Sequence, residues 1–342
     1  MASVETPSVA SGRDAYGPVG RSEWLDVDWR EHQRWVRVLG TPVNVIELGS
    51  GDPIVFIHGL SGSWQNWLEN LPHFARDHRV VAFDLPGFGA SPMPADRISI
   101  PGYARIVDAL LGELGIDAAC VVGNSMGGFI AAELAITVPE RVERLVLVSA
   151  AGISSQDLRT ERGMSALRRV EKVLTMYGGW LASRSELVAR RGRLRRSTFS
   201  IVARHPERIP APLVAEQLKG SGKPGFVDAL DALTDFPIED RLGQIACPTL
   251  IVWGTHDRLV PLRDADRFAA AIPGSRKLVY ADTGHVSMLE RPARFNADVD
   301  AFLADDAGEQ VGERSLGDAA QAEAERTGDP AAAAAGDDER PA

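Results

Sequence analysis

Short apolar runs alternate along this chain with longer stretches in which apolar residues recur at helical spacing. Continuous apolar runs are typical of parallel strands that are buried on both faces. Amphipathic stretches such as 103–114 and 264–271 lie between them. The expected strands are an antiparallel pair at 34–38 and 43–48, followed by 54–57, 80–83, 120–122, 145–149, 250–253 and 277–280.

This order of elements predicts an α/β fold, with a mostly parallel central sheet flanked by helices. We expect the core to comprise residues 20–153 and 245–303. Ligands of such folds bind beyond the carboxyl ends of the strands, so the residues that follow each strand are the first functional candidates.

The alternation is interrupted between residues 154 and 244, and we expect a helix-rich segment there. The segment is rich in arginine, which is most simply interpreted as a solvated face. The alternative is attraction to an acidic substrate or to anionic lipid, that is, a weak peripheral membrane contact through this segment. The arginines are Arg159, Arg162, Arg168, Arg169, Arg184, Arg190, Arg191, Arg193, Arg195 and Arg196.

Both ends of the chain are expected to be disordered. Residues 304–342 are acidic and contain almost no large apolar side chain, so they cannot bury enough surface to offset the entropy of ordering. Residues 1–19 are assigned to a second disordered end and lack the pattern of a secretory signal. The net charge of −10 argues against a nucleic-acid partner.

The two cysteines, Cys120 and Cys247, are interpreted as small core residues rather than a disulfide or reactive pair. Low cysteine usage suits a reducing compartment, and no run is long and apolar enough to span a bilayer. No metal-binding spacing is evident. We therefore expect a cytoplasmic protein with no metal.

The pentapeptide Gly-Asn-Ser-Met-Gly at 123–127 stands between an apolar run and a helix-prone, small-residue run. A serine on such a sharp strand–helix turn takes a strained conformation, and Gly123 and Gly127 supply the room for it. Backbone N–H groups at the helix N-terminus favour developing negative charge. Ser125 is therefore a candidate nucleophile, although a plain strand–helix turn would also use these residues.

Two further expected strands end in loops that present Asp257 and His285. The chain order is serine, aspartate, histidine, as expected when all three stand at the carboxyl ends of strands in one α/β sheet. A serine hydroxyl is a weak nucleophile at neutral pH. It needs a histidine to accept its proton and a carboxylate to orient that histidine.

With these motifs the chain resembles serine hydrolases of the α/β-hydrolase fold superfamily over roughly residues 35–303. The segment His58-Gly59-Leu60-Ser61-Gly62 matches the family's oxyanion loop, and Asp84-Leu85-Pro86-Gly87-Phe88-Gly89 matches its Asp-x-Pro-Gly-x-Gly turn. The resemblance implies oxyanion N–H groups on Leu60 and Met126, a structural role for His58, and a cap inserted at 154–244.

The resemblance also implies the chemistry. Relatives that open epoxides use an aspartate nucleophile, whereas Ser125 points to acyl transfer without a cofactor. The expected activity is carboxylic ester hydrolysis of a small-molecule substrate, as in carboxylesterases or monoacylglycerol lipases. One alternative is a C–C bond hydrolase of ring-cleavage products, whose nucleophile segment is similar. Another is a non-catalytic ligand receptor on the same fold.

Three aromatic residues are candidates for the substrate pocket: Trp64, Phe129 and Trp180. Their alternative role is ordinary core packing, which is the commoner fate of buried aromatic side chains.

Overall fold

The computed structural model describes residues 14–154 and 178–305. Its centre is an eight-stranded sheet with the order β1-β2-β4-β3-β5-β6-β7-β8, in which only the pairs β1–β2 and β2–β4 are antiparallel. The expected mostly parallel sheet and its leading antiparallel pair are therefore confirmed. The strands are β1 (Gln33–Val38), β2 (Thr41–Leu48), β3 (Pro53–Ile57), β4 (Arg79–Phe83), β5 (Ala119–Asn124), β6 (Val142–Val148), β7 (Thr249–Gly254) and β8 (Arg276–Tyr280).

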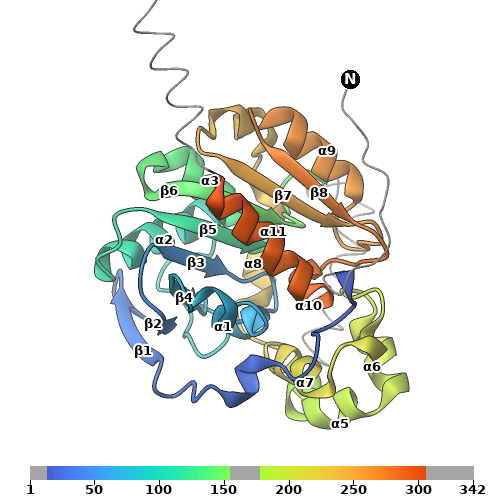
Figure 1. Cartoon of the computed structure of the whole chain (residues 1–342). Coiled ribbons are helices and arrows are strands. Elements are labelled where there is room, and N and C mark those ends of the chain that lie inside the picture. Colours follow the sequence, from blue (N-terminus) through green and yellow to red (C-terminus); the bar gives the residue numbers. More distant parts are fainter. Residues whose placement is uncertain (1–13, 155–177, 306–342) are drawn as a thin grey trace, which may run out of the picture. The chain divides into compact units, whose positions relative to one another are not determined.

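Both faces of the sheet are buried, as the continuous apolar runs predict. In β3, Val55 and Ile57 belong to the main core cluster, together with residues of α2, α3 and α9. The alternate residue Phe56 faces the other way, where its ring packs on Trp67 and Phe74. Figure 1 shows helices on both sides of the strands.

The helices between the strands are longer than the periodic pattern alone indicates. Helix α2 begins at Ile100 rather than 103 because the Ser99 hydroxyl caps it, accepting the Gly102 N–H at 3.1 Å. The α-helices are α1 (Leu71–Phe74), α2 (Ile100–Glu113), α3 (Met126–Thr137), α5 (Ser185–Arg190), α6 (Gly192–Phe199), α7 (Ala211–Lys219), α8 (Phe226–Asp235), α9 (Leu262–Ala271), α10 (Ser287–Glu290) and α11 (Pro292–Ala304). Short 3-10 helices are η2 (Glu23–Asp26), η3 (Trp64–Trp67), η4 (Pro139–Arg141), η6 (Pro206–Arg208) and η7 (Glu239–Gln244).

The described part of the expected cap, residues 178–244, contains α5, α6, α7 and α8, and Figure 1 shows α5, α6 and α7 grouped together. It is bonded to the core at several points. The Gln217 side chain donates to Gln65 O at 2.7 Å, and Gly225 N–H donates to Gly87 O at 3.0 Å. These contacts join cap residues to the two loops that follow β3 and β4.

The described cap residues 178–244 belong to the same compact unit as the described core residues up to 300. The expected core and cap boundaries stay predictions. The expected tail lies outside the described residues from 306 onward, as do residues 1–13 and the cap residues 155–177 with Arg159, Arg162, Arg168 and Arg169.

The expected N-terminal boundary needs a correction. Residues 14–19 are described, and Tyr16 is partly buried, with its hydroxyl hydrogen-bonded to Glu290 and its ring 4.8 Å from the Arg291 guanidinium. Local composition does not reveal this because the order comes from partners far along the chain. The segment that lies outside the described residues is 1–13, not 1–19.

Candidate active site

Ser125 occupies a strained turn between β5 and α3, with φ 55° and ψ −117°. Few residues other than glycine adopt such a conformation, so it must be held by its surroundings. Ser125 N–H donates to Val148 O at 2.9 Å, and Ser125 O accepts the Ala151 N–H at 3.0 Å. The turn is therefore fastened to β6 and the residues just after it.

The glycines beside Ser125 are required by close backbone approach. A Cβ on Gly123 would lie 2.3 Å from Gly127 O, and one on Gly127 would lie 2.2 Å from Ile57 O. Neither carbonyl can move without disturbing a strand or helix. The spacing of the motif is thus explained by sterics around the elbow.

The loop after β3 lies directly against this elbow. A Cβ on Gly59 would be 3.1 Å from the Ser125 Cβ. Gly62 N–H closes a turn onto Gly59 O at 3.0 Å, with Ser61 at φ 61°, and this bond does not use the Leu60 N–H. Met126 is the first residue of α3, so its N–H has no acceptor within the helix. The Gly59–Gly62 turn and helix α3 therefore use neither of the two N–H groups that are expected to form an oxyanion hole.

His58 holds the loop from beneath. Its ring is fully buried, Nε2 accepts the Leu85 N–H at 3.0 Å, and Nδ1 donates to Gly59 O at 2.8 Å. Burial lowers the pKa of His58, which keeps the ring neutral, and the two hydrogen bonds place its proton on Nδ1. The structural role implied by the resemblance fits these contacts, and His58 is not available as a proton acceptor for Ser125.

Asp257 and His285 come together although 28 residues separate them. Asp257 Oδ2 lies 2.8 Å from His285 Nδ1, and Asp257 Oδ1 accepts the N–H groups of Leu259 and Val260 at 2.8 and 2.9 Å. A carboxylate only accepts hydrogen bonds, so His285 Nδ1 must carry the proton. Nε2 is then the nitrogen that can take a proton from a nucleophile.

The electrostatics of Asp257 favour its charged form. Burial would raise the pKa of Asp257, but His285 and the two backbone donors outweigh it and hold that pKa below its usual value. Asp257 is therefore a permanent anion at neutral pH beside the His285 ring.

Asn124, which sequence reasoning passed over, connects the histidine to the elbow. Its buried amide donates to Val148 O at 3.1 Å and to His285 O at 3.3 Å. The signal was present in the sequence, since Asn124 is a polar residue at the end of an otherwise apolar strand, directly before the serine.

The three pocket candidates have different surroundings. Phe129 is fully buried against Phe236, with ring centroids 6.1 Å apart, and Trp64 packs on Trp29 at 4.9 Å. Trp180 is 47% exposed, which is not the environment of an enclosed pocket wall. A pocket role for any of them stays a prediction.

The described cap arginines are partly paired with acids and carbonyls. Arg190 lies 3.5 Å from Glu186 and Arg196 lies 3.4 Å from Glu207, while Arg195 donates to Ile209 O and Glu207 O. The expected membrane contact stays a prediction. Among residues 14–154 and 178–305, no helix combines the length and apolar character needed to cross a bilayer. Within the same ranges, no cluster of three histidine, cysteine or acidic side chains is placed to hold a metal ion.

Comparison with known proteins shows the family of the chain. The chain belongs to the alpha/beta hydrolase fold family, whose model matches residues 52–292. It is 33% identical, over 87% of this chain and 72% of the relative, to the dihydrolipoyllysine-residue acetyltransferase component of an acetoin cleaving system from Cupriavidus necator. It is 31% identical, over 80% of this chain and 94% of the relative, to a 2-hydroxymuconate semialdehyde hydrolase from a Pseudomonas species.

A solved structure of similar fold is a membrane phospholipase A, described as a bacterial virulence factor. It superposes with a TM-score of 0.63 at 27% identity, covering 82% of this chain and 90% of its own. The protein is thus an alpha/beta hydrolase, and the family contains both ester and carbon–carbon hydrolases.

Proposed function

We propose that this protein is a serine hydrolase that cleaves carboxylic esters through an acyl-enzyme on Ser125. The observation that carries the proposal is the 2.8 Å contact between Asp257 and His285 Nδ1. It fixes the tautomer in which Nε2 accepts a proton, and Asn124, the residue directly before Ser125, donates a hydrogen bond to the backbone carbonyl of the same histidine.

The proposed cycle follows from these groups. Ser125 Oγ attacks the ester carbonyl carbon while His285 Nε2 takes the hydroxyl proton, and Asp257 stabilises the resulting imidazolium. The N–H groups of Leu60 and Met126 stabilise the negative charge on the carbonyl oxygen. His285 then gives its proton to the leaving alkoxide, and the alcohol departs. Water, activated by the same ring, releases the carboxylic acid and restores Ser125.

The sequence of the oxyanion loop favours esters over C–C bond substrates. The loop Leu60-Ser61-Gly62-Ser63-Trp64 resembles the oxyanion loop of general esterases rather than the Gly-Pro-Gly type of C–C bond hydrolases. The structural likeness to a phospholipase A, an ester hydrolase by its name, is compatible with this choice but does not make it, since a meta-cleavage product hydrolase superposes with the same TM-score of 0.63.

A C–C bond hydrolase of ring-cleavage products is the second candidate. It is favoured by the 31% identity to a 2-hydroxymuconate semialdehyde hydrolase that aligns over nearly its whole length. Such a reaction also needs a serine nucleophile or an activated water, but its leaving group is a carbon atom that must be protonated. Because fold alone does not choose between these substrates, activity has to be measured on both.

The experiment is a substrate panel with the full-length protein. It comprises p-nitrophenyl esters from acetate to decanoate and, in parallel, a 2-hydroxy-6-oxo-dienoate from aromatic ring cleavage. The proposal expects kcat/KM for the best ester to exceed that for the dienoate. A preference for the dienoate would transfer the assignment to the second candidate. Turnover of neither class would favour a receptor on the same fold.

A further inference from the structure

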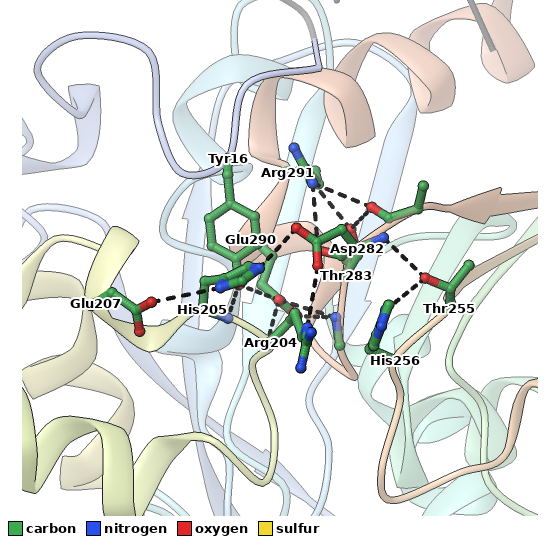
Figure 2. Close-up of polar contacts among 12 residues, drawn as sticks. Tyr16, Arg204, His205, Glu207, Thr255, His256, Asp282, Thr283, Glu290 and Arg291 are labelled. Atoms are coloured by element: carbon green, nitrogen blue, oxygen red, sulfur yellow. Dashed lines mark hydrogen bonds and ion pairs between the residues drawn. The ribbon is translucent and has the colours of Figure 1, made fainter.

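The loop at 281–284, which presents His285, is hydrogen-bonded to two consecutive residues. They are Glu290, the last residue of α10, and Arg291, which follows it. Arg291 donates to Ala281 O at 3.2 Å, to Asp282 O at 3.4 Å and to Thr283 Oγ1 at 3.2 Å. Figure 2 shows the side chains of Arg291, Asp282 and Thr283 close together, with Glu290 beside them. The position of His285 therefore depends on more than its bond to Asp257.

Glu290 binds the residue directly before the histidine. Both of its oxygens lie within reach of the Gly284 N–H, at 2.9 and 3.0 Å. Glu290 Oε2 also accepts the Arg204 N–H at 2.8 Å and the Tyr16 hydroxyl. All three partners are hydrogen-bond donors, so the Glu290 side chain only accepts hydrogen bonds. This is the behaviour of an ionised carboxylate.

The Glu290 side chain is fully buried, so its charge has to be stabilised by these donors. Burial raises the pKa of Glu290, and the hydrogen bonds from Tyr16, Arg204 and Gly284 oppose that rise. A buried acid with this number of donors is costly to disturb, because loss of the carboxylate would leave several buried donors without an acceptor.

The same contacts tie the cap to the histidine loop. Val202 O accepts the His285 N–H at 2.7 Å, and Arg204 N–H reaches Glu290. His205 N–H donates to the Tyr16 hydroxyl at 2.7 Å, and its ring Nε2 lies 2.8 Å from Asp282 Oδ2. Residues 202–205 of the cap are thus bonded to the loop on one side and to Tyr16 on the other.

The fit leaves little room for adjustment. A Cβ on Gly284 would lie 2.8 Å from Val202 O, 2.9 Å from Arg204 N and 3.0 Å from Glu290 Oε1. Gly284 is held between the cap backbone and the Glu290 carboxylate, so a shift of either would carry the adjoining His285 with it.

We propose that Glu290 is a positioning residue for His285. Its carboxylate, braced by Tyr16, fastens Gly284 to cap residue Arg204 and so sets the direction in which the His285 ring meets Asp257. The catalytic consequence of this arrangement rests on the proposed function, but the geometric one does not. A misplacement of about 1 Å can cost about 100-fold in rate.

The first test variant is Glu290→Gln. It keeps the shape of the side chain but places amide N–H groups against the donors of Gly284, Arg204 and Tyr16. Its kcat should fall about 10- to 100-fold through misplacement of the base. KM should stay within about threefold, because no substrate contact is removed. The downfield proton resonance of His285 Nδ1–H should shift or broaden, since it reports the bond to Asp257 without any substrate.

The second variant is Tyr16→Phe, which removes one hydroxyl and leaves the ring beside Arg291. It should cause a smaller loss of kcat and a smaller shift of the resonance in the same direction. It also keeps the test decisive if Glu290→Gln does not fold.

The matched control is Glu133→Gln on α3. Glu133 is also buried, and its carboxylate pairs with Arg241 at 2.6 Å, away from the histidine loop. This variant should lower Tm while leaving kcat and the His285 resonance unchanged. If loss of a buried carboxylate had a general effect, the control and the two test variants would all show a reduced kcat and a shifted His285 resonance, and this result would overturn the proposal.

The proposal is also overturned if Glu290→Gln folds with wild-type kcat and an unmoved resonance. A different result would show that the proposed function is wrong: the wild-type protein would turn over no substrate, or Ser125→Ala would stay active. In that case the resonance of His285 still decides whether Glu290 positions the ring.

Discussion

The side-chain amide of Asn124 donates a hydrogen bond of 3.3 Å to the backbone carbonyl of His285, 161 residues further along the chain. The same amide donates to Val148 O in β6. One buried side chain thus fixes three parts of the site relative to one another: the elbow that carries Ser125, the neighbouring strand, and the loop that carries the histidine.

We expect Asn124→Ala to lower both stability and activity. The change leaves two buried carbonyl groups without this donor, so the free energy of unfolding should fall by about 1–3 kcal/mol. The kcat should fall as well, because His285 loses a tether to the elbow. Urea unfolding and ester kinetics on the same preparation test this, and wild-type values for both would contradict the role assigned to Asn124.

Asp257→Asn should reduce kcat about 10²- to 10⁴-fold. The amide N–H can donate to Nδ1 and so favour the wrong tautomer of His285, and a neutral amide does not stabilise the charged ring. Asp282→Asn is the matched comparison. Its half-exposed carboxylate binds His205 and Arg204 on the cap side of the loop, so its loss should cost less than about 10-fold. A larger loss from Asp282→Asn would mean that the acid has been assigned wrongly.

Gly127→Ala should be one of the most damaging small changes in the molecule. The new Cβ would meet Ile57 O at 2.2 Å, and a strand carbonyl cannot move aside, so we expect about 3 kcal/mol of destabilisation or failure to fold. Gly192→Ala at the start of α6 is the control. A Cβ there meets nothing within 4 Å, and stability should rise by up to about 1 kcal/mol. Equal effects in thermal unfolding would refute the steric explanation.

The two thiols should be unreactive in the folded protein. Burial raises the pKa of Cys120 to about 12 and that of Cys247 to about 11. At pH 8 the reactive thiolate is then about one molecule in a thousand or fewer, and labelling should speed up about tenfold for each pH unit above that. Ellman's reagent should therefore react slowly with native protein and rapidly with both thiols in guanidinium. A fast-reacting native thiol at pH 8 would contradict this.

Much of the site is predictable from the sequence, because each strand end is marked by local pattern. Ser125, Asp257 and His285 follow apolar runs, and strand ends of a parallel sheet meet at one edge. The contacts of Asn124 with His285 and of Tyr16 with Glu290 cannot be predicted in this way. Polar pairs so far apart in sequence have no periodic signature, since only the folded chain selects which donor meets which acceptor.

The same limit explains the misplaced N-terminal boundary. Residues 14–19 have no helical or strand pattern of their own, and Tyr16 is ordered by Glu290, His205 and Arg291. The aromatic candidates show the converse problem. Burial of Trp64 and Phe129 follows from their apolar character, but whether an aromatic side chain packs in a core or lines a pocket depends on tertiary detail.

The central claim, that Ser125 is the nucleophile of an acyl-transfer cycle, is tested most directly by kcat of Ser125→Ala on the best substrate from the panel. The account predicts a fall of about 10⁴-fold or more, because the covalent route is lost and only binding and oxyanion stabilisation remain. A variant that folds like the wild type and keeps near wild-type kcat would contradict the assignment of Ser125 and the proposed cycle with it.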